Sequence, residues 1–278
     1  MTLTTGRGSQ YREASWLERI ASGSAKRAPA WMRRPLKRAY EALLAAVAGD
    51  HLISRLPGGE TLRVDAAYRQ LAWNPEEYAA LRAAVRPGAT VIDVGANVGA
   101  YTLLFATWAG PDGRVFAFEP ATASRTGLVR HLALNGLAGR VTVRSEAVSD
   151  GGGTRPFIDA GTHGDNRIVP AGTNGASVVP AVSLDDFCAD LAPPPDVIKI
   201  DVEGAELAVL RGARRTIAAR GASLALFVEL HPAIWPSLGI TRETIEEELS
   251  RQRLVVEPLP GVADPWTVQG VCVRLRPA

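Results

Sequence analysis

Residues 91–102 read VIDVGANVGAYT, and this stretch decides the fold. An apolar run carries Asp93 near its end, Gly95 and Gly99 follow, and a helical pattern begins after them. Gly95 allows a sharp turn in which the backbone meets a ligand with no Cβ in between, and Gly99 allows the next helix to pack closely. The Asp93 carboxylate is placed to accept hydrogen bonds from the loop or from a ligand. The stretch predicts a strand, a ligand-binding turn and a helix.

Strand-like apolar segments recur along the chain after this motif. They are VFAFE at 115–119, VTVRSEAV at 141–148, DVIKIDVEG at 196–204 and LALFVEL at 224–230. Helical segments at 100–108 and 125–134 alternate with the first of them, which predicts a parallel sheet with helices on both faces. Residues 254–258 and 270–275 are suited to a closing antiparallel pair. We therefore predict a doubly wound, mostly parallel α/β sheet of seven strands.

The 278 residues are long enough for one sizeable domain and an N-terminal addition. We assign residues 1–70 to a basic helical arm or cap, with helices near 12–21 and 30–48 and a short β piece, and residues 71–278 to the α/β domain. The first 50 residues hold nine Lys and Arg against four Asp and Glu, whereas the rest holds 22 against 25. A basic arm can attract nucleic acid, anionic lipid or an acidic substrate, but a solvated helix face is the favoured interpretation. Its role stays open among a pocket cap, a homodimer interface and a docking site for a carrier domain.

Cysteine content and hydropathy give an expectation for the cellular compartment. Cys188 and Cys272 are the two cysteines, far apart in sequence, so neither a disulfide framework nor a thiolate metal site is indicated. The most membrane-like stretch, residues 42–48, is too short to span a bilayer. We expect a cytoplasmic protein without stable membrane insertion.

A second acid indicates what the glycine turn binds. Glu119 ends its strand 24 residues after Gly95, where a carboxylate can bind two ribose hydroxyls. The dinucleotide fingerprint G-x-G-x-x-G fails because Asn97 replaces its second glycine. The zwitterionic tail of S-adenosyl-L-methionine suits the turn better, and residues 144–148 are expected at its adenine ring. The predicted cofactor-binding residues are Asp93, Gly95, Asn97, Gly99, Tyr101, Glu119, Pro120, Glu146, Ala147 and Asp201.

Further motifs resemble those of the FkbM-type methyltransferases, a family of natural-product and glycan modification. The most specific is IKIDVEGAELAVLRGA at 198–213, and the others are Glu119-Pro120, LNG at 134–136, EAVSD at 146–150 and VSLDD at 182–186. The resemblance extends from about residue 73 to residue 257. It implies a class I methyltransferase fold, S-adenosyl-L-methionine as donor with S-adenosyl-L-homocysteine as product, and usually O-methylation of a hydroxyl.

The candidate catalytic residues follow two neighbouring strands. Asp201 lies at the carboxyl end of the predicted fourth strand, beside the crevice where open α/β sheets bind ligands. If that strand continues, Lys199, Asp201 and Glu203 share one side of it. Glu229 and His231 reach the same rim, and histidine has a pKa suited to deprotonating a hydroxyl. We predict Asp201, Glu229 and His231 as catalytic and no required metal, with a Mg²⁺ site at the same three residues as the alternative.

Two further features have less specific interpretations. Glu206 begins a predicted helix, where an acid interacts favourably with the helix dipole, so we interpret it as structural. The polar, glycine-rich stretch 151–180 is long for a compact domain and is predicted to form a hairpin beside the pocket. For its His163, Asp165 and Asn166, a polar surface loop is favoured over a lid on the substrate.

The favoured function is methylation of a hydroxyl on a small molecule, either a secondary metabolite or a sugar, with no nucleic-acid partner. Methyl transfer from a sulfonium is an in-line displacement, so positioning of the nucleophile dominates catalysis. N-methylation of nucleic acid or protein is less favoured because residues 201–204 lack the aromatic platform that holds a flipped base. A non-catalytic nucleoside-binding module is the remaining alternative. The acceptor and the methylated atom stay open.

Overall fold

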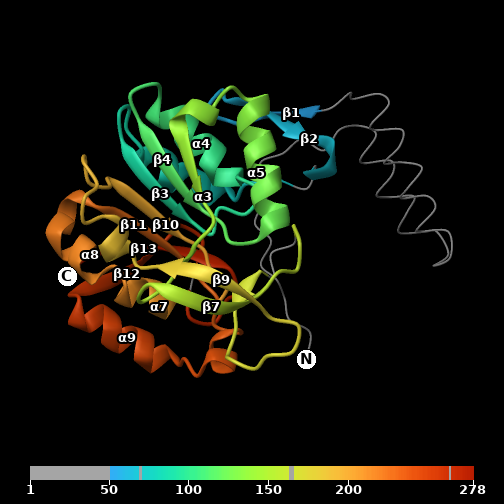
Figure 1. The fold of residues 1–278 in the computed structure, drawn as a ribbon. Coiled ribbons are helices and arrows are strands. Elements are labelled where there is room, and N and C mark those ends of the chain that lie inside the picture. Colours follow the sequence, from blue (N-terminus) through green and yellow to red (C-terminus); the bar gives the residue numbers. More distant parts are fainter. Residues whose placement is uncertain (1–50, 69–70, 163–165, 263) are drawn as a thin grey trace.

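The computed structural model describes residues 51–68, 71–162, 166–262 and 264–278 (Figure 1). Its centre is a seven-stranded sheet in the order β12-β13-β11-β10-β3-β4-β5. Five adjacent strands run parallel: β3 (Thr90–Val94), β4 (Arg114–Phe118), β5 (Val141–Arg144), β10 (Val197–Ile200) and β11 (Ala225–Leu230). Strand β13 (Val271–Pro277) inserts antiparallel between β11 and β12 (Leu254–Pro258). The predicted doubly wound, mostly parallel sheet of seven strands and its closing antiparallel pair are confirmed.

Alternation along the strands explains how both faces are covered. On β3, Val91 packs in one hydrophobic cluster and its neighbour Ile92 in the other, because successive side chains point to opposite faces. The first face is covered by α3 (Pro75–Ala84), α4 (Ala100–Ala109) and α5 (Thr122–Leu134). The second is covered by α6 (Leu184–Phe187), α7 (Glu206–Arg211), α8 (Arg214–Arg220) and α9 (Arg242–Arg251) (Figure 1). Short 3-10 turns lie at η1 (Ala66–Tyr68), η2 (Ala138–Arg140), η3 (Gly221–Ser223) and η4 (Trp235–Leu238).

A hairpin of β1 (His51–Arg55) and β2 (Thr61–Asp65) precedes this domain. It packs on the end of α5, where Asn135 accepts a hydrogen bond from the Arg63 amide at 2.8 Å and donates one to the Arg63 carbonyl at 2.7 Å. Leu62 and Val64 enter the same hydrophobic cluster as α5. The β piece predicted for the N-terminal region is therefore present and docked on the sheet domain. The helices predicted at 12–21 and 30–48 lie outside the described residues.

The polar stretch between the third and fourth parallel strands of the sequence forms most of a second, four-stranded sheet. Its order is β6 (Ala147–Val148), β9 (Ser177–Val182), β7 (Gly153–Ile158) and β8 (Arg167–Ile168). Strands β7 and β9 pair antiparallel, so the hairpin predicted for residues 151–180 is confirmed. It lies across the front of the molecule in Figure 1. His163 and Asp165 lie outside the described residues.

Helix α3 begins at a well-defined cap. The Asn74 side chain accepts hydrogen bonds from the amides of Glu76 and Glu77, and Pro75 occupies the first helical position. The cap fixes Glu77 on the first turn of α3, on the side that faces the sheet. None of the helices described is both long and apolar enough to cross a bilayer.

Candidate functional site

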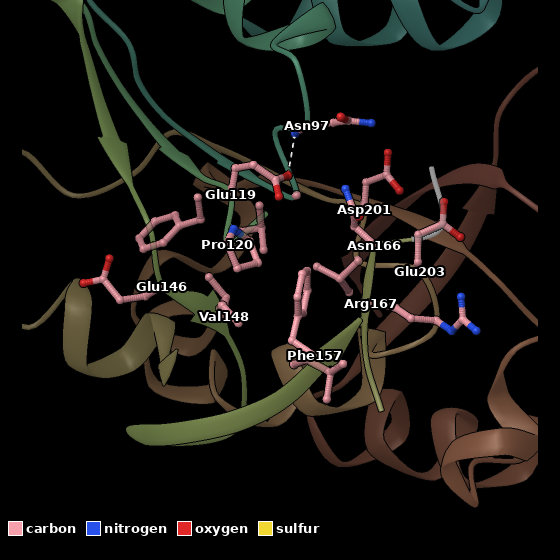
Figure 2. Close-up of a pocket in the computed structure, with 16 residues that line it drawn as sticks. Asn97, Glu119, Pro120, Glu146, Val148, Phe157, Asn166, Arg167, Asp201 and Glu203 are labelled. Atoms are coloured by element: carbon pink, nitrogen blue, oxygen red, sulfur yellow. Dashed lines mark hydrogen bonds between the residues drawn. The ribbon is translucent and has the colours of Figure 1, made fainter. Parts of the chain in front are cut away.

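A pocket of about 600 Å³, including its open mouth, lies at the carboxyl ends of β3, β4 and β10. Open α/β sheets bind ligands at this edge. Seven of the predicted cofactor-binding residues line it: Gly95, Asn97, Glu119, Pro120, Glu146, Ala147 and Asp201. Figure 2 shows Glu119 and Pro120 in the middle of the pocket, between Glu146 on one side and Asp201 on the other.

The glycine turn has the conformation that its sequence predicts. Gly95 has a φ of +83°, and a Cβ there would lie 1.7 Å from the carbonyl oxygen of Asp201. A Cβ on Gly99 would lie 2.5 Å from Cδ1 of Leu128 on α5. Between them Asn97 has a φ of +47°, a conformation that asparagine tolerates better than most residues. The turn thus brings β3, β10 and α5 together at distances that leave no room for a side chain at either glycine.

Glu119 is held in the pocket by two main-chain amides. Its Oε2 accepts a hydrogen bond from the Asn97 amide at 2.8 Å (Figure 2), and its Oε1 accepts one from the Ala121 amide at 2.7 Å. Burial raises the pKa of Glu119 to about 7, against the opposing effect of the two amides. Each carboxylate oxygen accepts more than one hydrogen bond, so both remain available to ribose hydroxyls.

The far side of the pocket is largely apolar. Val148 and Phe157 line it, and both are almost fully buried. Glu146 reaches the same side and forms an ion pair with Arg144. A planar base fits such a wall, which agrees with the adenine position expected from residues 144–148.

These residues fit S-adenosyl-L-methionine. Glu119 suits the ribose, the Val148 and Phe157 wall suits the adenine, and Gly95 brings the turn into the lining without a side chain. Asp201 and Glu203 line the opposite rim, where their carboxylates suit the positive charges of the ammonium and sulfonium groups.

Three predicted cofactor-binding residues lie behind the pocket wall and do not line it. Asp93 is 2 % exposed and accepts a hydrogen bond from the Thr102 hydroxyl at 2.5 Å, and burial raises the pKa of Asp93 to about 6. Gly99 packs against α5. Tyr101 donates a hydrogen bond to Oε2 of Glu77 at 2.7 Å. Their positions indicate that they shape the glycine turn and the start of helix α4.

Beside the pocket lies a group of charged residues that we name the acid cluster: Glu77, Lys199, Asp201, Glu203, Glu206, Glu229 and His231. At its centre Lys199, 2 % exposed, lies 3.0 Å from Asp201, 3.5 Å from Glu77 and 3.8 Å from Glu229. Burial lowers the pKa of Lys199, but the surrounding carboxylates outweigh burial and raise it well above its usual value. Lys199 is therefore charged. As predicted, it shares a side with Asp201, although β10 ends at Ile200 and Glu203 lies beyond the strand with a φ of +49°.

His231 faces the cluster from the opposite side. Its Nδ1 lies 2.7 Å from Oε1 of Glu206, and the Trp235 indole donates a hydrogen bond to Oε2 of Glu206 at 2.8 Å. Burial lowers the pKa of His231, but the hydrogen bond to Glu206 and the charge of Asp201 outweigh it and raise the pKa to about 10. With this pKa, His231 is protonated at neutral pH and cannot act as a general base. Glu206, interpreted from the sequence as a structural acid, is fully buried and orients the histidine.

The two other predicted catalytic residues differ in protonation. Burial favours a high pKa for Asp201, but Lys199 and His231 outweigh it, so the pKa of Asp201 is lowered and the carboxylate is ionised. Burial and the charge of Asp201 raise the pKa of Glu229 well above its usual value. Asp201 also lines the pocket, whereas Glu229 and His231 lie behind it. Asp201 is thus the candidate catalytic residue that the pocket and the acid cluster share.

The family model described as the methyltransferase FkbM domain matches residues 93–251, which is more than half of the chain. The chain belongs to the FkbM methyltransferase family. The matched segment contains the glycine turn, Glu119 and six of the seven residues of the acid cluster, all except Glu77.

Two curated proteins are similar to this FkbM-family chain. The hexuronic acid methyltransferase AglP of Haloferax volcanii is 30 % identical over 58 % of this chain and 63 % of its own length. The methyltransferase sdnD of Sordaria araneosa is 29 % identical over 44 % of this chain and 59 % of its own length. The chain therefore spans about three fifths of either relative. Among solved structures, the FkbM methyltransferase of Methylobacillus flagellatus has a TM-score of 0.45 and 18 % identity, over 98 % of this chain and 63 % of that one.

Some pocket residues of this FkbM-family chain were not predicted from its sequence. Phe157, Arg167 and Ile168 reach the pocket from strands β7 and β8. Asn166, the residue before β8, also lines the pocket, so the surface-loop interpretation favoured from the sequence is wrong for this residue. Asn166 is fixed there by donating to the Gly161 carbonyl at 2.7 Å and accepting from the Ala160 amide at 2.7 Å. The length and polarity of residues 151–180 were the signal for this wall, but sequence spacing does not show which side chains turn inward.

Proposed function

We propose that this chain is an S-adenosyl-L-methionine-dependent O-methyltransferase that methylates a hydroxyl of a small molecule, a secondary metabolite or a sugar. The observation that carries the proposal is the shared position of Asp201. Its main chain closes the cofactor turn against Gly95, the residue lines the pocket, and its ionised carboxylate belongs to the acid cluster beside it. A proton acceptor thus lies beside the site that fits the methyl donor.

The proposed reaction needs little more than alignment and one proton acceptor. The hydroxyl oxygen attacks the methyl carbon, the C–O bond forms as the C–S bond breaks, and S-adenosyl-L-homocysteine leaves as a neutral thioether. The hydroxyl becomes strongly acidic as its oxygen is alkylated, so a carboxylate is basic enough to take the proton. We assign that role to Asp201, with Lys199 and His231 holding its charge in place.

The relatives support a sugar-like acceptor. AglP is named for hexuronic acid, which is a sugar acid, and it is 30 % identical over the matched region. By this similarity, the acceptor of this chain is a hydroxylated small molecule, and the chain has no nucleic-acid or membrane partner in this proposal. The two cysteines are unpaired, in keeping with a reducing compartment such as the cytoplasm.

The test combines cofactor binding with product analysis. Calorimetry with S-adenosyl-L-homocysteine should give micromolar binding, and labelled methyl groups should be transferred to one member of a panel of sugars, uronic acids and phenols. The Asp201→Asn variant should keep S-adenosyl-L-homocysteine affinity within about tenfold and lose transfer by about 100-fold or more. The exposed Glu257→Gln variant is the matched control and should match the wild type in both assays.

The product distinguishes the outcomes. An alkali-stable methyl ether supports the proposal. An alkali-labile methyl ester, a methylamine product, or a folded wild type that does not bind S-adenosyl-L-homocysteine contradicts it.

A further inference from the structure

The acid cluster contains more carboxyl groups than its two cationic side chains balance. Five carboxyl groups lie within 4 Å of Lys199 or His231: Glu77, Asp201, Glu203, Glu206 and Glu229. The Lys199 side chain is 2 % exposed and the His231 side chain 3 %, so bulk water does little to screen these charges. The cluster thus gathers five carboxyl groups, each a potential oxygen ligand, around two basic side chains.

Two of the carboxylates are divided between Lys199 and His231 in the same way. Asp201 turns Oδ2 toward Lys199 at 3.0 Å and Oδ1 toward Nε2 of His231 at 3.8 Å. Glu229 turns Oε2 toward Lys199 at 3.8 Å and Oε1 toward the same Nε2 at 3.7 Å. Lys199 thus holds one oxygen of each carboxylate, while the other oxygen of each faces the imidazole.

The buried Nε2 of His231 points into the space between these oxygens. The carboxylate oxygens of Asp201, Glu203 and Glu229 lie 3.4 to 3.8 Å from it, which is beyond normal hydrogen-bond length. Metal–ligand bonds of about 2.1 Å place pairs of ligand atoms about 3 to 4 Å apart. One atom each from Asp201, Glu229 and His231 all lie within 4.8 Å of one another.

The other ring nitrogen has the partner that metal-binding histidines usually have. Nδ1 contacts Oε1 of Glu206 at 2.7 Å, and Glu206 is itself fixed by the Gly204 amide at 2.9 Å and the Trp235 indole at 2.8 Å. A carboxylate on the second nitrogen orients the ring and makes the first nitrogen a better ligand. This support lies outside the three ligand residues themselves.

We propose that Asp201, Glu229 and His231 form a binding site for one divalent transition-metal cation, with Glu206 and Lys199 orienting the ligands. The cation takes the place of the proton that Nε2 of His231 carries in its absence, because a metal-bound imidazole is neutral. One imidazole nitrogen with two carboxylate oxygens suits Mn²⁺ or Zn²⁺ better than Mg²⁺, which prefers oxygen ligands throughout. The expectation from sequence that no metal is required is the alternative to this proposal. In the proposed methyl transfer, a cation held there would act as a Lewis acid that lowers the pKa of the acceptor hydroxyl, and Asp201 would then serve as its ligand and accept the released proton only on Oδ2, the oxygen that faces Lys199. That role rests on the proposed function, whereas cation binding does not.

The test is titration of the full-length, EDTA-treated protein with MnCl₂, with free Mn²⁺ measured by electron paramagnetic resonance. We expect one site per chain. Glu229→Gln and His231→Gln should each weaken Mn²⁺ binding by about tenfold or more, Glu206→Gln by about 10- to 100-fold, and the exposed Glu257→Gln should leave it unchanged. Calorimetry with S-adenosyl-L-homocysteine on every variant checks that the neighbouring pocket is folded.

A second measurement needs no variant. Crystals soaked in MnCl₂ should show an anomalous peak between Asp201, Glu229 and His231. A wild type that binds S-adenosyl-L-homocysteine but no Mn²⁺, or a peak elsewhere, overturns the metal site and leaves the methyltransferase proposal standing. A wild type that binds Mn²⁺ at the cluster but no S-adenosyl-L-homocysteine supports the metal site and contradicts the proposed function.

Discussion

The Glu119 side of the pocket and the acid cluster are held together in different ways. Glu119 is fixed by the main-chain amides of Asn97 and Ala121, which are close to it in sequence or on the adjacent strand end. In the acid cluster, Lys199 and His231 are fixed by carboxylates from α3, α7 and the ends of β10 and β11. A main-chain site depends on the path of the backbone, whereas a side-chain site depends on every partner at once. Substitutions should therefore affect stability in the cluster and ligand binding at Glu119.

The largest effect on stability is expected from Lys199→Met. Methionine retains the aliphatic length but leaves Asp201, Glu77 and Glu229 without the ammonium, so the free energy of unfolding should fall by about 3 to 5 kcal/mol. Urea unfolding measures it. Arg215→Met, which removes an exposed ion pair with Asp186, is the control and should cost less than about 1 kcal/mol. Equal losses in both variants would remove the distinction between the two regions.

The next effect is expected from Gly95→Ala. A Cβ would lie 1.7 Å from the Asp201 carbonyl oxygen at a φ of +83°, so the turn must move, at a cost of about 2 to 4 kcal/mol. Calorimetry should show S-adenosyl-L-homocysteine affinity reduced by about 100-fold. Gly139→Ala, where a Cβ meets nothing within 4 Å, should leave affinity and stability near the wild type. Normal affinity in Gly95→Ala would show that the turn does not form the cofactor site.

Glu119 should make cofactor binding depend on pH. Its pKa is about 7 because burial disfavours the charge, and the ionised carboxylate is the form that accepts hydrogen bonds from ribose hydroxyls. The ionised fraction falls from about 0.9 at pH 8 to about 0.1 at pH 6, so S-adenosyl-L-homocysteine affinity should fall about tenfold over that range.

The control for this prediction is Glu119→Gln. It should weaken binding by about 10- to 100-fold at pH 8, for loss of charge-assisted hydrogen bonds, and remove the pH dependence. A variant that keeps the full dependence would point to Asp93, whose pKa is about 6, as the responsible group.

The smallest effect is expected from Asn166→Ala. This variant loses the hydrogen bonds to Gly161 and Ala160 that fix Asn166 at the pocket, so S-adenosyl-L-homocysteine affinity should fall about threefold to tenfold. The free energy of unfolding should change by less than about 1 kcal/mol. Thr173→Ala, on the same hairpin but away from the pocket, should leave affinity unchanged. The same affinity in both variants would mean that the hairpin does not contribute to binding.

The sequence predicts the parts of this site whose geometry is local. The alternation of strands and helices gave the sheet, and the spacing of Gly95 and Glu119 placed both at the pocket, because the strand ends of a parallel sheet meet at one edge. Tyr101 was assigned to the cofactor because it follows the turn. In the structure its hydroxyl bonds to Glu77 on α3, an element whose position relative to α4 depends on tertiary packing.

The protonation states in the acid cluster also depend on tertiary packing, which sequence spacing does not show. Histidine before a proline at a strand end predicts a base of ordinary pKa. The structure places Glu206 at 2.7 Å from His231, and this contact between residues 25 positions apart reverses the expected charge. No periodicity in the sequence encodes that distance, because it depends on how α7 packs against β11.

The charge on the pocket lining bears on how the proposed reaction would end. Among the described lining residues, Glu119, Glu146, Asp201 and Glu203 are acidic and Arg167 is basic. The sulfonium donor carries a positive charge that this lining attracts, and the thioether left after transfer does not. In the proposed reaction, the electrostatic contribution of this lining to affinity would be lost in the same step that forms the thioether, which would favour release of the spent cofactor.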